Sequence, residues 1–171
     1  MARAKKALWD EGYSLGVNPK PSAEGIKNLR KLARMLDRDA DNKKGIRFDL
    51  SIFGKTKVPH DQLKVTAFGF LTVKRGFKPE LSCGTTACAV GYAALSGKFK
   101  GLSYTVDEDG AIHVDGSNKV FDLTNEQWEF LFEDSSYEGV TTGARGERKV
   151  AKRIRQFCAG EVRPHHWSYG D

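Results

Sequence analysis

The sequence has few cysteines and prolines and no long hydrophobic segment. Its 171 residues include three Cys and five Pro. Three Cys cannot all pair within one chain, so we expect a reducing, cytoplasmic environment rather than a disulfide framework. No apolar run approaches the ~20 residues that a membrane-spanning helix needs. The first ten residues, MARAKKALWD, are basic and lack a following apolar segment, which predicts neither a membrane protein nor a secretory signal.

Signature motifs of common cofactor-binding and catalytic modules are also missing. The chain has no P-loop, no GxGxxG and no HExxH pattern. It also lacks zinc-finger spacing, an RNP motif and the GxxG loop of a KH domain. We therefore expect no bound cofactor, and function has to be inferred from charge, amphipathic patterns and the few nucleophilic side chains.

Apolar residues make up 39% of the chain and aromatic residues 11%, enough for one folded domain of this length. We divide the chain into a basic N-terminal arm (1–21), a single domain (22–160) and a C-terminal tail (161–171). Helical and strand patterns are mixed without a regular βαβ alternation, which is typical of an α+β fold. We expect a small, mostly antiparallel sheet packed with about four helices.

Local signals place most elements of that fold. They predict a helix from the N-cap Ser22 to about Arg38, a short strand at 48–52, a hairpin of 102–106 with 111–114, a helix after the capping box of Thr124 and Gln127, and a last helix from about Thr142 to Cys158, closed by Gly160.

Two segments are less regular. Residues 64–73 (KVTAFGFLTV) are β-branched and aromatic, which predicts one strand, with Gly69 marking a bulge or a close backbone approach. The Ala- and Gly-rich segment 83–95 predicts a helix that begins at Thr85 or Thr86 and ends near Ser96. A glycine inside a helix lowers stability by about 1 kcal/mol relative to Ala. Gly91 therefore indicates a position where close packing leaves no room for a side chain.

The formal net charge of +6 conceals a strong segregation. Residues 1–78 carry 18 basic and 8 acidic side chains, a net of +10; residues 79–142 have a net of −8 and residues 143–171 a net of +4. Such asymmetry is typical of proteins that bind nucleic acid or another polyanion. The alternative is that the basic ends fold back onto the acidic middle and neutralise it.

Two amphipathic helices concentrate the basic residues. At 100° per residue, four cations of the last helix lie within about 80° of arc; we call them the basic stripe: Arg145, Arg148, Lys152 and Arg155. Lys149 and Arg153 widen the stripe on one side. The first helix contributes a second group, the α1 basic face: Lys27, Arg30, Lys31 and Arg34. Arginines at this spacing can contact successive phosphates, so these eight residues are the candidate anion-binding site. The alternative is a basic face that is simply solvated, or one that pairs with the acidic segment 126–138.

The cysteines offer weaker candidates for chemistry. Cys83 and Cys88 could ligate a metal, with Cys158, His113, His165 or His166 completing the site, but the C-x4-C spacing is not diagnostic. If a helix begins at Thr85 or Thr86, its N-terminus would favour a Cys83 thiolate. A Cys83 nucleophile would then need a His partner, and His60, His113, His165 and His166 are all candidates. Structural cysteines, with Cys88 buried, are the simpler interpretation.

Four short blocks follow one another along the chain: NLRKLA at 28–33, CGTTACAVGYA at 83–93, WEFLF at 128–132 and VAKRI at 150–154. This order resembles a group of small, uncharacterised proteins encoded by bacteriophages and bacteria. The pattern Cys-Gly-Thr-x-x-Cys-x-x-Gly is the most specific part of the resemblance. It implies a phage or bacterial origin and brings no mechanism with it.

We therefore expect a non-enzymatic, cytoplasmic accessory protein that binds an anionic partner, namely a nucleic acid, a nucleotide or an acidic host protein. A role in host takeover or in blocking a host defence follows from the resemblance alone. One alternative is an oligomeric structural or virion-associated protein, anchored by exposed aromatics (Trp9, Trp128, Trp167 and Tyr169) and by opposite charges matched between subunits. The other is an enzyme with Cys83 as its nucleophile.

Overall fold

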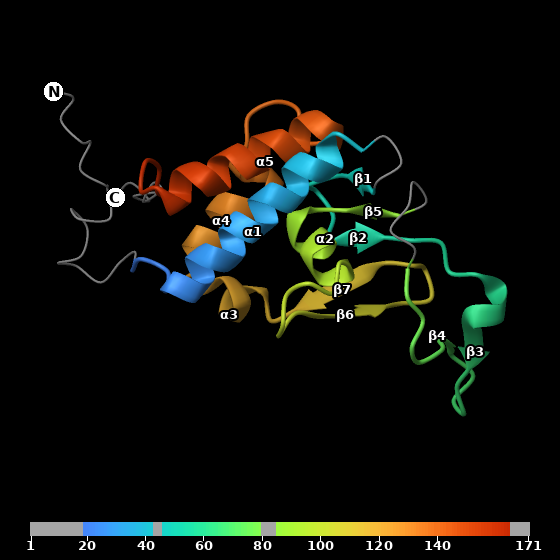
Figure 1. Ribbon diagram of the computed structural model, residues 1–171. Coiled ribbons are helices and arrows are strands. Elements are labelled where there is room, and N and C mark those ends of the chain that lie inside the picture. The colour runs from blue at the N-terminus through green and yellow to red at the C-terminus, as the bar shows by residue number, and fades with distance from the viewer. Residues whose placement is uncertain (1–18, 43–45, 80–84, 165–171) are drawn as a thin grey trace, which may run out of the picture.

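The computed structural model describes residues 19–42, 46–79 and 85–164. The predicted arm and tail lie largely outside these ranges. Figure 1 shows the arrangement of the elements, which in chain order are α1 (Ala23–Ala40), β1 (Arg47–Phe48), β2 (Gly54–Lys55), the 3-10 helix η3 (His60–Gln62), β3 (Leu63–Val65), β4 (Leu71–Val73), β5 (Thr86–Ala87), α2 (Ala89–Leu95), β6 (Ser103–Val106), β7 (Ile112–Asp115), α3 (Ser117–Phe121), α4 (Asn125–Phe132), the 3-10 helix η4 (Asp134–Ser136) and α5 (Gly143–Cys158).

The N-termini of α1 and α4 follow the predicted caps. The Ser22 side chain accepts a hydrogen bond from the Gly25 amide and starts α1. The capping box at α4 is complete, because Thr124 and Gln127 each accept the other's backbone N–H. These caps satisfy amide groups that a helix N-terminus leaves without partners. The predicted first and last helices are confirmed within one or two residues.

α1 and α5 lie side by side and run in opposite directions (Figure 1). Their apolar sides meet in a seam of fully buried residues: Leu29, Leu32, Leu36, Val150, Ile154 and Phe157. α3 and α4 pack against the same core. There Phe121 of α3 makes an edge-on ring contact with Phe99 and a tilted one with Phe132 of α4. Since the apolar positions of both helices are committed to this seam, their charged positions face outward.

The sheet is smaller and more divided than expected. β1, β5 and β2 form a three-stranded sheet in which β5 pairs parallel with β1 and antiparallel with β2. β6 and β7 form the predicted antiparallel hairpin, and β3 and β4 form another. The α+β class and the mostly antiparallel pairing are confirmed, with five α-helices described in place of about four.

The prediction of one strand over 64–73 is wrong, because the chain reverses at its centre. Val65 pairs with Leu71, and the Thr66 amide bonds to the Phe70 carbonyl at 2.8 Å. Gly69 has a φ of +83° and no neighbour that its missing side chain would meet. It therefore serves a three-residue hairpin turn, where a left-handed residue is needed, rather than a close backbone approach.

The prediction that a helix begins at Thr85 or Thr86 is also wrong. The carbonyls of Thr85 and Ala87 accept hydrogen bonds from the Arg47 and Asp49 amides at 2.9 and 3.2 Å. Pairing with β1 on one side and β2 on the other holds this segment extended. α2 starts only at Ala89, where Cys88 is the N-cap. Tertiary pairing has overridden the local capping signal of the threonines.

The packing reason inferred for Gly91 is confirmed. A Cβ at this position would lie 1.8 Å from the Phe53 carbonyl oxygen, so α2 can approach the segment before β2 only without a side chain. This approach also sets the position of the Phe53 backbone.

We expect Gly91→Ala to lower the free energy of unfolding by about 1–3 kcal/mol, the usual cost of overpacking a rigid site. In an open helix the same change would stabilise by about 1 kcal/mol. Urea denaturation of both proteins measures the difference. An unchanged or higher midpoint for the variant would contradict the close approach.

Candidate functional site

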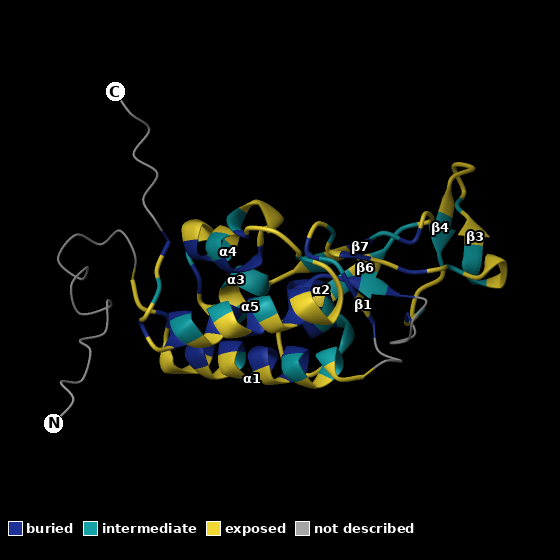
Figure 2. Cartoon of the chain, turned by 90° about the horizontal axis from the view of Figure 1, so that it is seen from above, coloured by how far each residue is buried: buried dark blue, intermediate teal, exposed yellow. Residues whose placement is uncertain are grey.

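The two predicted basic groups lie on adjacent helices. The α1 basic face and the basic stripe of α5 occupy the outer side of the α1–α5 pair, which Figure 2 shows as largely exposed. All eight predicted residues are described; seven are exposed, and Lys31 is half-buried. α1 and α5 together carry eleven Lys and Arg against four Asp and Glu. Residues more than a hundred positions apart thus form one cationic surface.

Two arginines of the basic stripe form ion pairs with carboxylates at the C-terminal end of α1. Arg148 contacts Asp41 at 2.5 Å, and Arg155 contacts Asp37. All four side chains are 40% or more exposed, so each pair contributes at most about 1 kcal/mol in solvent. These contacts hold the two arginines over the line where α1 meets α5. Because the pairs are weak, another anion can replace the carboxylates.

The remaining stripe and face residues differ in their contacts. Lys27 pairs with Glu24 on its own helix at 3.1 Å. Lys31 donates to the Lys98 carbonyl at 2.5 Å and lies over the Phe99 ring, so it joins α1 to the segment before β6. Within the described part of the chain, four of the eight candidates make neither an ion pair nor a side-chain hydrogen bond: Arg30, Arg34, Arg145 and Lys152. These four are the most available to a ligand.

The acidic segment 126–138 does not cover the basic stripe. It meets the other side of α5, where Arg153 donates to the Phe130 and Ser136 carbonyls at 2.9 and 2.6 Å. The guanidinium also lies 3.5 Å from the centre of the Tyr137 ring, and burial lowers its pKa. Lys149 donates to the Glu138 carbonyl. Arg153 and Lys149 therefore hold the end of α4 and the segment after it against α5, and they do not widen the anion-binding surface.

The described cysteines, Cys88 and Cys158, are both buried. Cys88 is buried at the N-cap of α2, where its sulfur accepts from the Gly91 amide at 3.4 Å, and burial raises its pKa to about 11. Cys158 is likewise buried with a pKa of about 11. Cys83 lies outside the described residues. Since α2 starts at Ala89 and not at Thr85 or Thr86, the helix-dipole argument for a Cys83 thiolate no longer applies.

No metal or catalytic cluster emerges among the residues that the structure describes, which hold no group of three His, Cys, Asp or Glu side chains fit to bind a metal ion. His113 pairs with Asp107 at 3.3 Å across the exposed β6–β7 hairpin, and His60 is exposed in η3. His165 and His166 fall outside the described ranges, as do the predicted anchors Trp9, Trp167 and Tyr169.

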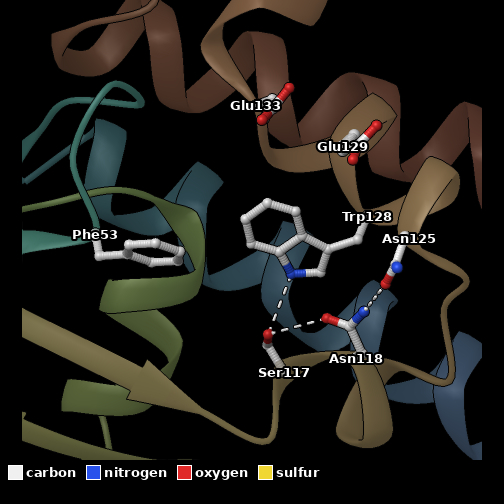
Figure 3. Close-up of a pocket in the computed structure, with 7 residues that line it drawn as sticks. All are labelled: Phe53, Ser117, Asn118, Asn125, Trp128, Glu129 and Glu133. Atoms are coloured by element: carbon white, nitrogen blue, oxygen red, sulfur yellow. Dashed lines mark hydrogen bonds between the residues drawn. The ribbon is translucent and has the colours of Figure 1, made fainter.

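The structure also reveals a groove that the sequence did not predict, beside the fourth predicted anchor. Trp128 is half-buried; its ring packs 5.9 Å from Phe53, and its indole N–H donates to the Ser117 hydroxyl at 3.1 Å (Figure 3). Two adjoining cavities of about 270 and 490 Å³ meet here. Their polar rim includes three exposed carboxylates: Glu129, Glu133 and Asp134. We call this the acidic groove. The acidic run beside Trp128 was its only sequence signal.

Comparisons with protein-family models, with curated proteins and with solved structures find no match for this chain. Among the described residues, no helix has both the length and the apolar character required to cross a bilayer. Function therefore has to be inferred from the charge and geometry of the surfaces described above.

A carboxyl pair, with Glu147 buried and Asp39 half-buried, lies beside the cationic surface and links three helices. Glu147 of α5 is only 3% exposed and hydrogen-bonds to Asp39 of α1, which also bonds to the Tyr92 hydroxyl of α2. Burial first, and then the Asp39 carboxylate, raise the pKa of Glu147 to about 8. A neutral Glu147 donates its proton to Asp39, so this pair adds less negative charge to the surface than its composition implies.

The raised pKa makes stability depend on pH. The folded protein keeps a proton that the unfolded chain releases near pH 4.5, so the free energy of unfolding falls as pH rises from there to about 8. One proton corresponds to a slope of at most about 1.4 kcal/mol per pH unit.

Glu147→Gln should remove this fall, because its amide donates to Asp39 at every pH. Urea denaturation at pH 5 and pH 8 measures the effect, and Glu138→Gln, at an exposed carboxylate, is the control. Equal pH dependence in Glu147→Gln and the unaltered protein would contradict the assignment.

Proposed function

We propose that this protein is a non-enzymatic, polyanion-binding protein and that it holds the phosphate backbone of a nucleic acid against the paired faces of α1 and α5. The observation that carries the proposal is the alignment of the basic stripe with the α1 basic face on one exposed surface. Arginine suits this partner, because its planar guanidinium makes bidentate contacts with phosphate.

The shape of the site favours an extended anion over a single nucleotide. The basic side chains lie along two neighbouring helices and not in a cavity. Neither of the two cavities at the acidic groove is lined by Lys or Arg. A small anion would thus find no enclosed cationic pocket there, whereas a polymer can contact several exposed arginines at once.

The local ion pairs are compatible with such a ligand. Asp37 and Asp41 interact with Arg155 and Arg148 in solvent-exposed positions, where pairing is weak. A phosphate can replace each carboxylate without any change in the backbone. The same proposal includes a phage or bacterial origin, which rests on the resemblance carried by the 83–91 block, and action in the cytoplasm.

Fluorescence anisotropy with labelled duplex DNA, single-stranded DNA and RNA tests the proposal over 20–300 mM salt. Log affinity should fall linearly with log salt, by about 0.9 for each phosphate contact on a duplex. The variant Arg145→Glu/Lys152→Glu should lose at least two contacts, reducing the slope by about 2. Both residues are exposed and unpaired, so the fold should be retained.

The matched control is Lys55→Glu/Lys57→Glu, which changes the net charge equally on exposed lysines of β2 and the segment that follows it, outside α1 and α5. It should bind almost as the unaltered protein does. Equal losses in the two variants would show that only net charge matters. Absence of binding at low salt would overturn the nucleic-acid assignment, and tighter binding of poly-glutamate would assign the surface to an acidic protein instead.

A further inference from the structure

The β3–β4 hairpin projects from the body of the protein at the end opposite the first turn of α1 and the last turn of α5 (Figures 1 and 2). None of residues 57–78 is buried. Four large apolar side chains on the hairpin are highly exposed: Val65 at 66%, Phe68 at 87%, Phe70 at 71% and Leu71 at 50%. An isolated two-stranded hairpin is marginally stable in water, and a contiguous exposed apolar surface marks an interaction site.

The register of the hairpin organises these side chains. Directly paired residues share a face, so the pairs Leu63–Val73 and Val65–Leu71 place four apolar side chains on one face. Phe70, which precedes Leu71 and accepts from the Thr66 amide, lies on the opposite face with Lys64. Phe68 lies at the turn between the strands. The surrounding segment is basic, with five cations against the single acid Asp61: Lys57, Lys64, Lys74, Arg75 and Lys78. A partner for this hairpin therefore needs an apolar surface bordered by carboxylates.

The acidic groove has that chemistry. Phe53, 43% exposed, and Trp128 form its aromatic wall, and Leu50, Ile52 and Phe132 extend the apolar lining. Glu129, Glu133 and Asp134 stand at its rim. In the described part of the chain, no Lys or Arg pairs with these three carboxylates. Figure 3 shows the Trp128 ring beside Phe53, with Glu129 and Glu133 on the other side of the indole.

We propose that the β3–β4 hairpin of one copy docks in the acidic groove of a second copy. Phe68 and Phe70 lie against Phe53 and Trp128, while the hairpin cations lie beside the groove carboxylates. The two surfaces match in both apolar character and charge. They come from different parts of the chain, so the contact is heterologous and each copy keeps one free hairpin and one free groove. Further copies can join until a ring closes or an open chain forms.

This inference is independent of the proposed function, because neither surface includes a residue of the α1 basic face or the basic stripe. Arg145→Glu/Lys152→Glu should therefore assemble as the unaltered protein does. A hairpin variant should keep the affinity for nucleic acid that the α1 and α5 residues confer. The two proposals can fail separately.

Light scattering coupled to size exclusion, and sedimentation velocity, measure the assembly from about 1 to 200 μM. The average mass should rise with concentration and fall as salt screens the charges. Phe68→Ser/Phe70→Ser removes the hairpin aromatics, and Glu129→Lys/Glu133→Lys reverses the groove charge. Each variant alone should remain monomeric. Val140→Ser, at an apolar side chain that is 48% exposed elsewhere, is the matched control and should assemble normally.

Mixing the two defective variants gives the decisive result. The first retains an intact groove and the second an intact hairpin, so an equimolar mixture should form a dimer and grow no further. Assembly of the groove variant by itself would overturn the proposal and indicate hairpin-to-hairpin pairing. A monomer at every concentration would also overturn it, and binding of the hairpin to anionic lipid vesicles in that case would assign it to a membrane surface.

Discussion

The antiparallel contact between α1 and α5 is the interaction on which the rest of the structure depends. Its seam removes the apolar sides of both helices from water, and burial of such side chains stabilises by about 1.5–3 kcal/mol each. Beneath the surface, the hydrogen bond between Glu147 and Asp39 joins the same two helices, and Asp39 connects them to Tyr92 of α2. Because the apolar faces of α1 and α5 pack against each other, the charged faces of both helices point outward. The core and the cationic surface are two consequences of one contact.

The same arrangement keeps unlike charges apart. The acidic segment packs on the far side of α5, where Arg153 holds it through backbone carbonyls and two aromatic rings. Among the described residues, Asp37 and Asp41 are the acidic partners of the basic stripe. Over the described residues, the surface therefore includes three regions of distinct chemistry: the cationic α1–α5 pair, the acidic groove and the basic, apolar β3–β4 hairpin. We propose the first as a phosphate-binding surface and the other two as partners between copies.

Local sequence signals were sufficient wherever one segment decides its own structure. Ser22 and Thr124 cap helices through side-chain hydrogen bonds to residues three positions away, so their effect is legible in a short window. The α+β class, α1, α5 and the β6–β7 hairpin were predicted on this basis. The segment 64–73 was misjudged because its composition favours strand throughout, and only the turn at Gly69 shows that there are two strands. The segment from Thr85 was misjudged because its pairing partners, β1 and β2, lie some 30 to 40 residues earlier.

The sequence by itself determined which side chains of each helix face water, because a period of 3.6 residues sorts apolar from charged positions without reference to the rest of the chain. It thereby placed seven of the eight candidate anion-binding residues at exposed positions, while Lys31 is half-buried against Phe99. Only the tertiary structure decided that the two basic faces adjoin and that the acidic segment lies elsewhere. Only the tertiary structure, too, brought Phe53, Ser117 and Trp128 together in one groove. Adjacency of distant segments is set by how all the apolar faces pack at once, and no local pattern records that outcome.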